Sequence, residues 1–424
     1  MTAPRRPRWP WVVFLAVLGV LVITAASFVV VRLTAPLPRA TVQINTAATL
    51  ALGGAAAAAI PMPSRGSFAL SASTLGTVAS YNATVERPTG SVAKAMTALV
   101  VLDALPLAPG AAGPSRTMTA ADVQLYRQAV AEGGSNLAVR AGEVFDERDL
   151  LLALLLPSAD NIAESLAVWV SGNRIAFIAR LNAKATALGM AHTHYADPSG
   201  LSNRTVSTAA DLVLLAKAVI ENPTLAALVA VQQVRLADGS VLHNLDVLLQ
   251  QQPGWLGIKT GWTGAAGGCL LFAAQRSYGT APGLSVTVWG AVLGQPAMTA
   301  PDPAHPELGA AFFEAKNAVA AVLNSYRAVD LSEATPALSG TVSTVWGGTA
   351  LVELLPLDGT NMVLVRGPAT LQLSVATFNA VAPLRANAQV GRIKGVLNGT
   401  NVTWRVIVSD AIAAPSLWWK LVNG

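Results

Sequence analysis

The sequence predicts a mixed α/β (α+β) protein with an N-terminal transmembrane helix and a small C-terminal all-β domain. An uncharged apolar run at residues 9–31 predicts the membrane helix. Within residues 63–329, helical periodicity gives way to three consecutive strand-like runs at 256–263, 268–275 and 284–293. Beyond residue 329, short strand-like runs alternate with Gly, Asn and Asp turns and no convincing helix, which indicates a separate β domain.

Composition narrows the class of protein. The chain has 424 residues, of which 53% are hydrophobic and 12% charged, so it can bury a sizeable core. Three of the positive charges behind the net charge of +5 are Arg5, Arg6 and Arg8, before the apolar run. No basic stripe with interleaved aromatics is present, so we expect no nucleic-acid partner. The single cysteine, Cys269, excludes an intrachain disulfide.

The N-terminal region, residues 1–33, is interpreted as a cytoplasmic stub and a membrane anchor. Trp9 to Val31 comprises 23 uncharged residues, and as a helix it would span roughly 34 Å against about 30 Å for a bilayer core. The arginines before it predict a cytoplasmic N-terminus, a single pass through the cell membrane and an extracytoplasmic main domain. A cleaved signal peptide is the alternative, although the run is long and Val29–Arg32 is a poor cleavage site.

The remaining boundaries follow from changes in composition. Residues 34–62 are rich in Ala, Thr and Pro and are expected to form a linker that lifts the main domain, 63–329, off the membrane. Residues 330–424 form the predicted small β domain. Its tail, Leu417 to Leu421, is expected to pack against that domain rather than to touch a membrane.

A Ser and a Lys three residues apart mark the first group that can carry chemistry. Ser91 and Lys94 open a helical pattern that runs to Leu105, so both side chains share one helix face. Serine needs a base, and a buried lysine loses its proton more readily because desolvation disfavours its charged form. The chain has 7 lysines against 21 arginines, and arginine cannot serve as a base. Alone, the pair also fits an ordinary helix start.

Two further segments contain candidate residues. Leu156 to Asn161 ends a very apolar helix and places Ser158 on a loop, where a simple helix cap is the better interpretation of the segment taken alone. Gly257 to Thr263 places Lys259 and Thr260 on one strand before Gly261, a pattern that can bind a carboxylate while the strand pairs with an extended peptide. A hairpin strand with an exposed lysine fits as well.

Taken in order, the three segments match a known set of Ser-x-x-Lys, a second serine element and Lys-Thr-Gly. The chain resembles the D-alanyl-D-alanine carboxypeptidases among the low-molecular-weight penicillin-binding proteins. The resemblance covers about residues 63–330, and 330–424 resembles that family's smaller C-terminal β domain less specifically. It extends to Ala93–Ala98, Asp149–Leu151, Leu155–Ser158, Leu188–Met190, Asp197–Ser202, Ser207–Leu212 and Gly257–Gly261.

The resemblance implies a β-lactamase/transpeptidase-like fold, with an antiparallel sheet flanked by helices. It implies that Ser91 is the nucleophile, that Lys94 is its general base and that Ser158 relays a proton to the leaving amine. The implied substrate is a peptidoglycan stem peptide ending in D-Ala-D-Ala, and β-lactam antibiotics would acylate the same serine. No metal and no cofactor are implied.

The resemblance also implies a set of substrate-binding residues: Lys259, Thr260, Gly261, Trp262 and Asp160. Lys259 and Thr260 would engage the terminal carboxylate, and the backbone N–H groups of Ser91 and Trp262 would form the oxyanion hole.

Asp160 departs from the family pattern, which is usually Ser-x-Asn. An aspartate lacks the amide donor for the substrate's peptide carbonyl, and its charge would pair with Lys94 or Lys259 and hold that lysine in its protonated form. Alternatively, Asn161 points inward in its place, or Asp160 is tolerated. The sequence leaves these possibilities open.

Other functions compete less well. A triad hydrolase needs a histidine, and the chain has four histidines but no Gly-x-Ser-x-Gly elbow. A β-lactamase would need a deacylating carboxylate, for which only Glu164 is near in sequence. A catalytically impaired penicillin- or peptidoglycan-binding protein stays open because of Asp160. His192 and His194 suggest a metal site only if a third ligand exists.

Overall fold

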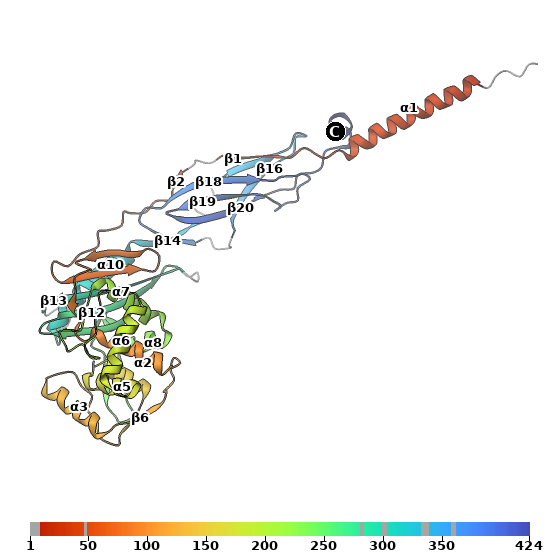
Figure 1. Cartoon of the computed structure of the whole chain (residues 1–424). Helices are drawn as coiled ribbons and strands as arrows, with labels where there is room; N and C mark the ends of the chain where they lie inside the picture. Colours follow the sequence, from red (N-terminus) through yellow and green to blue (C-terminus); the bar gives the residue numbers. More distant parts are fainter. Residues whose placement is uncertain (1–8, 46–48, 280–283, 299–302, 332–338, 358–361) are drawn as a thin grey trace, which may run out of the picture. The chain divides into compact units, whose positions relative to one another are not determined.

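A computed structural model describes the chain apart from residues 1–8, 46–48, 280–283, 299–302, 332–338 and 358–361 (Figure 1). Arg5, Arg6 and Arg8 therefore lie outside the described residues. The chain divides into two compact units. One comprises residues 57–326, and the other combines residues 1–56 with 327–424.

An antiparallel sheet forms the centre of the unit 57–326, in the order β11-β12-β13-β3-β4. Its strands are β3 (Ser67–Ala72), β4 (Gly76–Tyr81), β11 (Trp255–Thr263), β12 (Gly267–Ser277) and β13 (Ser285–Gln295). The three consecutive strands predicted from the sequence are confirmed as β11, β12 and β13. Strand β11 lies at one edge of this sheet, which becomes important for the site.

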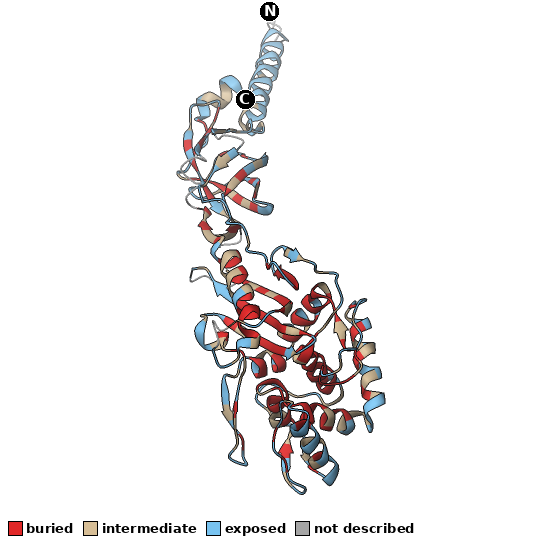
Figure 2. Ribbon diagram, turned by 90° about the vertical axis from the view of Figure 1, so that its left-hand side faces the viewer, coloured by how far each residue is buried: buried red, intermediate tan, exposed pale blue. Residues whose placement is uncertain are grey.

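Helices cover both faces of the sheet. Because successive strand residues point to opposite faces, Leu271 and Phe272 of β12 face different layers. Leu271 belongs to the core shared with α7 (Ala209–Glu221) and the other helices of this unit. Phe272 is equally buried but lies outside that core, on the face against which α10 (Pro306–Asn324) packs. Figure 2 shows the resulting buried interior of this unit. The predicted antiparallel sheet flanked by helices is confirmed.

The remaining helices of this unit form the layer that carries the first two candidate segments. They are η1 (Gly90–Val92), α2 (Ala93–Ala104), α3 (Ala120–Ala131), α4 (Glu147–Leu155), α5 (Asp160–Ser171), α6 (Arg174–Ala187), α8 (Pro223–Val229) and α9 (Leu248–Gln251). Side-chain caps start several of them; Asp146, for example, accepts a hydrogen bond of 2.7 Å from the backbone N–H of Asp149 at the start of α4. Most of α2 is buried, and Lys94 near its start is fully buried.

Short strand pairs complete the unit 57–326. They are β5 (Arg87–Pro88) with β8 (Val206–Ser207), β6 (Ser115–Thr117) with β7 (Val144–Asp146), and β9 (Gln233–Arg235) with β10 (Val241–His243).

The second unit is built on a seven-stranded sheet in the order β1-β15-β16-β20-β19-β18-β2. Its strands are β1 (Thr41–Asn45), β2 (Thr49–Ala51), β15 (Ser339–Ser343), β16 (Thr349–Pro356), β18 (Thr370–Phe378), β19 (Gln389–Leu397) and β20 (Thr400–Val408), beside a separate pair of β14 (Tyr326–Asp330) and β17 (Met362–Arg366). The core is separate from that of the other unit and is centred on Trp404, whose side chain is fully buried.

Two predictions for this unit are wrong. Residues 34–62 are not only a linker, because β1 pairs with β15 and β2 pairs with β18. Val42 and Ile44 alternate with exposed residues and pack on the β-domain core, so this segment completes the sheet. The β region also contains a helix, α11 (Leu417–Asn423). It has only seven residues, too few for periodicity to reveal it.

Helix α1 (Trp9–Thr34) matches the predicted apolar run. It has 26 residues, a mean hydropathy of 2.8, and no buried residue. By length and composition it can cross a membrane.

A buried carboxyl outside the candidate segments makes stability depend on pH. Glu147 is fully buried, and neither of its carboxylate oxygens has a hydrogen-bond partner among the described residues. Burial, and then the charge of Asp146, raise the pKa of Glu147 from 4.5 to about 7. The folded state therefore holds this proton at pH values where the unfolded chain has released it.

We predict that the contribution of Glu147 to the free energy of unfolding is largest below pH 4.5 and falls as pH rises through about 7. The loss should be on the order of 2–3 kcal/mol. Urea unfolding of the wild type and of Glu147→Gln between pH 5 and 8 measures it. The variant should lose this slope, whereas Glu132→Gln, at an exposed position, should keep it. Equal slopes in Glu147→Gln and the wild type would contradict the assignment.

Candidate active site

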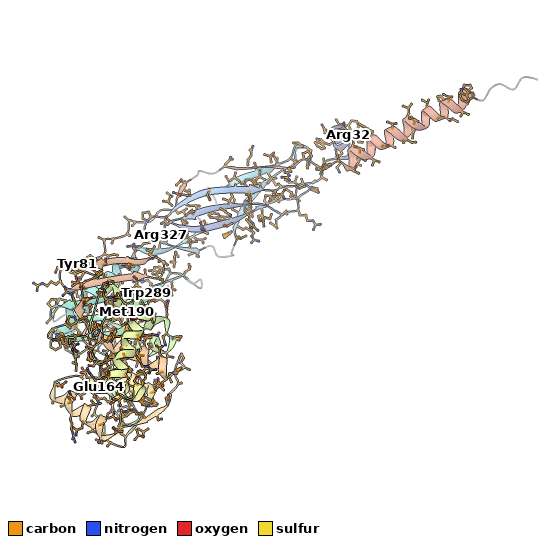
Figure 3. All side chains as sticks on the ribbon, viewed as in Figure 1. Arg32, Tyr81, Glu164, Met190, Trp289 and Arg327 are labelled. Atoms are coloured by element: carbon orange, nitrogen blue, oxygen red, sulfur yellow. The ribbon has the colours of Figure 1, made fainter. Side chains whose placement is uncertain are left out.

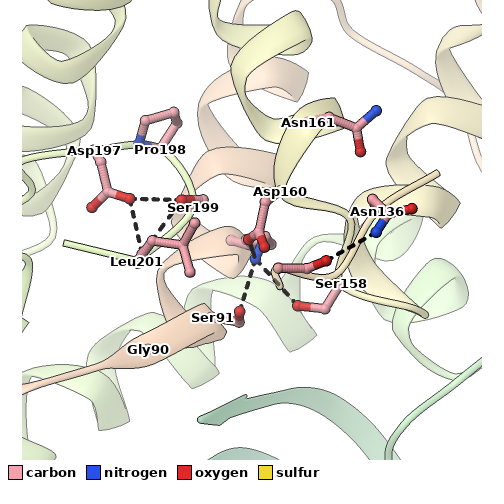
Figure 4. A network of polar contacts seen from close by, with 12 residues as sticks. Gly90, Ser91, Asn136, Ser158, Asp160, Asn161, Asp197, Pro198, Ser199 and Leu201 are labelled. Atoms are coloured by element: carbon pink, nitrogen blue, oxygen red, sulfur yellow. Dashed lines mark hydrogen bonds and ion pairs between the residues drawn. The ribbon is translucent and has the colours of Figure 1, made fainter. Parts of the chain in front are cut away.

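The first candidate pair lies where η1 runs into α2. Ser91 is partly exposed, whereas Lys94, one helical turn later, is fully buried. The Lys94 Nζ donates a hydrogen bond of 2.8 Å to Ser91 Oγ (Figure 4). The Ser91 hydroxyl therefore lies between the solvent and a lysine amine that is itself shielded from water.

Ser158 approaches the same amine from the loop that joins α4 to α5. Its Oγ accepts a hydrogen bond of 3.2 Å from Lys94 Nζ. The backbone of Ser158 has a φ of 69°, in the left-handed region that residues other than glycine rarely adopt. The next residue, Ala159, donates its N–H to the Ala153 carbonyl at 3.0 Å and so ties the loop back to α4. Such local strain is typical of functional loops.

Asp160 supplies the third contact to the amine. Its Oδ1 lies 2.6 Å from Lys94 Nζ, and both side chains are removed from water. Asn161 is turned away: its amide group pairs with the backbone N–H and carbonyl of Leu137 at 3.0 and 2.9 Å (Figure 4). The structure thus answers the question that the sequence left open, because the aspartate and not the asparagine faces the lysine.

Strand β11 brings Lys259 and Thr260. Lys259 is only 1% exposed, and its Nζ donates to the Thr260 carbonyl at 3.2 Å. Burial, followed by the positive charge of Lys94, holds the pKa of Lys259 well below its ordinary value of 10.5, while Asp160 and Asp246 act in the opposite direction.

Asp246 connects this strand to the helical layer. Its Oδ2 accepts a hydrogen bond of 2.9 Å from Trp255 Nε1 at the start of β11. Burial raises the pKa of Asp246 to about 6, so near neutral pH it carries most of a negative charge that favours the ammonium form of Lys259.

Glycines allow β11 to approach the Ser91 turn. A Cβ at Gly261 would lie 3.0 Å from the Ser91 nitrogen, and a Cβ at Gly90 would lie 3.0 Å from the Trp262 nitrogen. The backbone nitrogens of Ser91 and Trp262 therefore lie close together at the Ser91 turn. The Trp262 side chain is 51% exposed. Gly261 and Trp262 are thus close to the Ser91 turn, and Lys259 is near enough to Lys94 for their charges to interact.

A cavity of about 330 Å³ has Asp160 in its lining. It is lined mainly by polar residues of α3, α5 and the following loops: Gln128, Glu132, Asp160, Asn161, Glu164, Arg174, Asp197, Ser199 and Ser202, with the apolar Leu125, Ala129 and Leu201. Glu164, labelled in Figure 3, accepts two hydrogen bonds of 3.1 Å from Arg174 Nε. That arginine therefore engages the carboxylate considered for deacylation.

The loop from Asp197 to Ser202 closes the site and was not assigned a role from the sequence. Asp197 accepts hydrogen bonds from Ser199 Oγ at 2.7 Å and from the Leu201 N–H at 3.0 Å, which folds the loop on itself. A Cβ at Gly200 would lie 1.9 Å from the Gly90 carbonyl oxygen, so only glycine fits there. The Asp-Pro-Ser-Gly turn chemistry indicates a tight loop but not its packing against the nucleophile turn. The amino-acid pattern around Asp246 does not indicate its role.

Within the described ranges, no group of three or more His, Cys, Asp and Glu side chains is placed to hold a metal ion. His192 and His194 accordingly lack a third ligand there.

Comparison with known proteins agrees with this geometry. A family model described as D-alanyl-D-alanine carboxypeptidase matches residues 62–288, more than half of the chain. The D-alanyl-D-alanine carboxypeptidase DacB2 of Mycobacterium tuberculosis is 36% identical over 200 residues, which are 45% of this chain and 64% of that protein. The chain thus spans slightly less than two thirds of the length of this relative.

A Streptomyces protein extends the match. The D-alanyl-D-alanine carboxypeptidase of strain K15 is 31% identical over 259 residues, which are 55% of this chain and 86% of that protein. The crystal structure of the Streptomyces K15 DD-transpeptidase superposes with a TM-score of 0.52 at 26% identity, and the match covers 62% of this chain and 98% of that one. On the matched sequence and the shared fold, the chain belongs to the D-alanyl-D-alanine carboxypeptidase family.

Proposed function

We propose that this chain is a membrane-anchored serine D-alanyl-D-alanine carboxypeptidase, which removes the terminal D-alanine from peptidoglycan stem peptides and is acylated by penicillins. The observation that carries the proposal is the Lys94 amine, which is buried and hydrogen-bonded to both Ser91 Oγ and Ser158 Oγ. A serine between a shielded amine and two backbone N–H groups has the parts that acyl transfer needs.

In the proposed acylation step, Ser91 Oγ attacks the carbonyl carbon of the penultimate D-alanine. Neutral Lys94 takes the hydroxyl proton, and the negative charge on the carbonyl oxygen is stabilised by the N–H groups of Ser91 and Trp262. The peptide C–N bond then breaks. Ser158, in contact with Lys94, passes the proton to the departing amine of the last D-alanine. Water hydrolyses the ester on Ser91 and regenerates the enzyme.

Recognition of the substrate's terminal carboxylate is assigned to Lys259 and Thr260. In its ammonium form, Lys259 supplies a positive charge in a site that excludes water, where such a charge binds a carboxylate strongly. The free edge of β11 in the described sheet lets an extended stem peptide pair with the backbone, and Gly261 leaves room for it next to Ser91.

For location, we propose that α1 anchors the chain in the cell membrane, with the N-terminus in the cytoplasm and the chain that follows α1 outside. The length and hydropathy of α1 support a span, and the arginines that precede it in sequence support this orientation. The proposed substrate, a cell-wall peptide, is found on that side.

A second candidate function is a binding protein with impaired turnover. The Lys94–Asp160 ion pair favours it, because a carboxylate at 2.6 Å stabilises the ammonium form of the lysine and opposes its use as a base. Asp160 also cannot donate the hydrogen bond that an asparagine amide would give to a substrate carbonyl.

Labelling with a fluorescent penicillin, alongside D-alanine release from a cell-wall pentapeptide, tests the reaction. The wild type should form a covalent adduct and release D-alanine. Ser91→Ala should lose the adduct and about 10³-fold or more of the release, because the other hydroxyl that Lys94 contacts among the described residues, that of Ser158, is buried. Ser277→Ala, at an exposed position, serves as the control. A label that survives in Ser91→Ala would refute the acyl-enzyme, and a label without D-alanine release would favour the binding protein.

Asp160→Asn should raise the rate of D-alanine release by about tenfold, equivalent to ~1.4 kcal/mol of activation free energy. The amide keeps the size of the side chain, removes the carboxylate that pairs with Lys94 and restores a donor. The measurement is kcat for the pentapeptide, with Asp103→Asn as a control that alters only an exposed ion pair. Unchanged or lower rates in Asp160→Asn, with an intact fold by circular dichroism, would show that Asp160 does not impair the enzyme.

The pH profile should show an alkaline limb in kcat/KM, because Lys259 must stay protonated to bind the carboxylate. The low pKa of Lys259 places this limb well below 10.5. Asp246→Asn removes a charge that favours the ammonium form, so the limb should move to lower pH. Lys259→Arg should abolish the limb because arginine does not titrate. An unchanged limb in Lys259→Arg would assign it to another group, and Asp238→Asn is the exposed control.

A further inference from the structure

The cavity that has Asp160 in its lining is connected to the reacting serine in two ways. Asp160 Oδ1 lies 2.6 Å from Lys94 Nζ, and the same amine lies 2.8 Å from Ser91 Oγ (Figure 4). The Asp197–Ser202 loop also lines the cavity, and its glycine packs against the Gly90 carbonyl in the nucleophile turn. The cavity is therefore within reach of a long side chain of a peptide bound at Ser91.

The lining of this cavity is strongly negative. It contains one guanidinium and four carboxylates, which belong to Arg174 and to Glu132, Asp160, Glu164 and Asp197. Arg174 is already engaged, because its Nε donates two hydrogen bonds of 3.1 Å to Glu164. Asp197 is occupied by hydrogen bonds within its own loop. The negative charge that remains for a ligand is therefore that of Asp160 and Glu132.

Asp160 contributes a carboxylate oxygen that its lysine partner does not use. Oδ1 pairs with Lys94, whereas Oδ2 accepts no hydrogen bond from the residues that the structure describes. A Cβ at Gly134 would lie 2.6 Å from Oδ2, so the missing side chain at Gly134 leaves room beside this oxygen. The Asp160 side chain is only 6% exposed. A carboxylate oxygen so far removed from water favours a ligand that donates a hydrogen bond and carries a positive charge.

The lining suits an organic cation better than a metal ion. Within the described part of the chain, no group of three or more His, Cys, Asp and Glu side chains is placed to hold a metal. An ammonium on a flexible stem has three donors and needs fewer charged partners. In the proposed substrate, the two D-alanine side chains are methyl groups, too small to fill a cavity of about 330 Å³. The residue before them is the first whose side chain can reach it.

We propose that this cavity binds the side-chain ammonium of the residue that precedes the D-alanyl-D-alanine end, with Asp160 shared between that ammonium and Lys94. The substrate is then a peptide with a diamino residue, such as lysine, at that position. An asparagine at position 160 could donate to a substrate carbonyl, but it has no charge with which to hold a cation. The inference rests on the proposed function and adds a requirement for one residue of its substrate.

The test compares two synthetic pentapeptides that end in D-Ala-D-Ala and carry either lysine or Nε-acetyl-lysine immediately before that end. The two peptides share the same aliphatic stem and differ in the ammonium charge. Their dissociation constants are measured by calorimetry on the full chain with Ser91→Ala, where no turnover is needed. The kcat and KM for D-alanine release are measured with the wild type.

On Ser91→Ala, the lysine peptide should bind about tenfold more tightly than the acetylated peptide, because it adds a charge-assisted hydrogen bond in a buried place. The wild type should show the same preference in KM. Adding Asp160→Asn should remove most of the preference, and Glu132→Gln should reduce it by a smaller factor. Asp103→Asn, which alters an exposed ion pair outside the cavity, should keep it.

Equal affinity of the two peptides on Ser91→Ala would overturn the proposal, as would a full preference that persists with Asp160→Asn. Penicillin labelling of the single variant Asp160→Asn checks that its site is folded. If that variant takes no label, the decision passes to Glu132→Gln, where an undiminished preference overturns the proposal. Failure of the proposed function has a different signature: the wild type would release D-alanine from neither peptide, while binding on Ser91→Ala would still depend on the charge.

Discussion

The buried ion pair between Lys94 and Asp160 is the interaction on which the site depends. Three separate segments meet at the lysine amine: its own helix α2, the loop that carries Ser158, and the first turn of α5. Removing two charges from water costs several kcal/mol for each ion, and only close geometry with further hydrogen bonds offsets that cost. The amine here has three oxygen partners, which use all of its donors. This satisfaction fixes the rotamers of both serines before any substrate arrives.

The same pair creates a conflict between stability and chemistry. A lysine whose contacts hold three elements together does so best as a charged ammonium group, whereas a general base must be a neutral amine. Lys259 is similarly buried. The positive charge of Lys94 disfavours its ammonium form, whereas the negative charge of Asp246 favours it. The charge of Lys94 therefore contributes to the low pKa of Lys259.

Sequence reasoning predicted the parts of the site that depend on short-range geometry. Ser91 and Lys94 are one helical turn apart, so their contact follows from spacing alone. The choice between Asp160 and Asn161 could not be predicted, because adjacent helix residues point about 100° apart and the phase is set by the strained turn at Ser158. The support that Asp246 gives to β11 depends on Trp255 across a turn, and β1 depends on a partner strand far along the chain; neither leaves a periodic signal.

The pairing of β1 with β15 also imposes an order on biosynthesis. Residues 57–326 form one contiguous segment and can fold as soon as they have been synthesised. The other unit is discontinuous: Thr41 lies opposite Ser343, and the centre of the sheet needs β20, close to the C-terminus. The strands next to α1 must therefore wait, unpaired, while the whole catalytic segment is synthesised between them and their partners. Strands that are translated late therefore complete the sheet to which β1 and β2 belong.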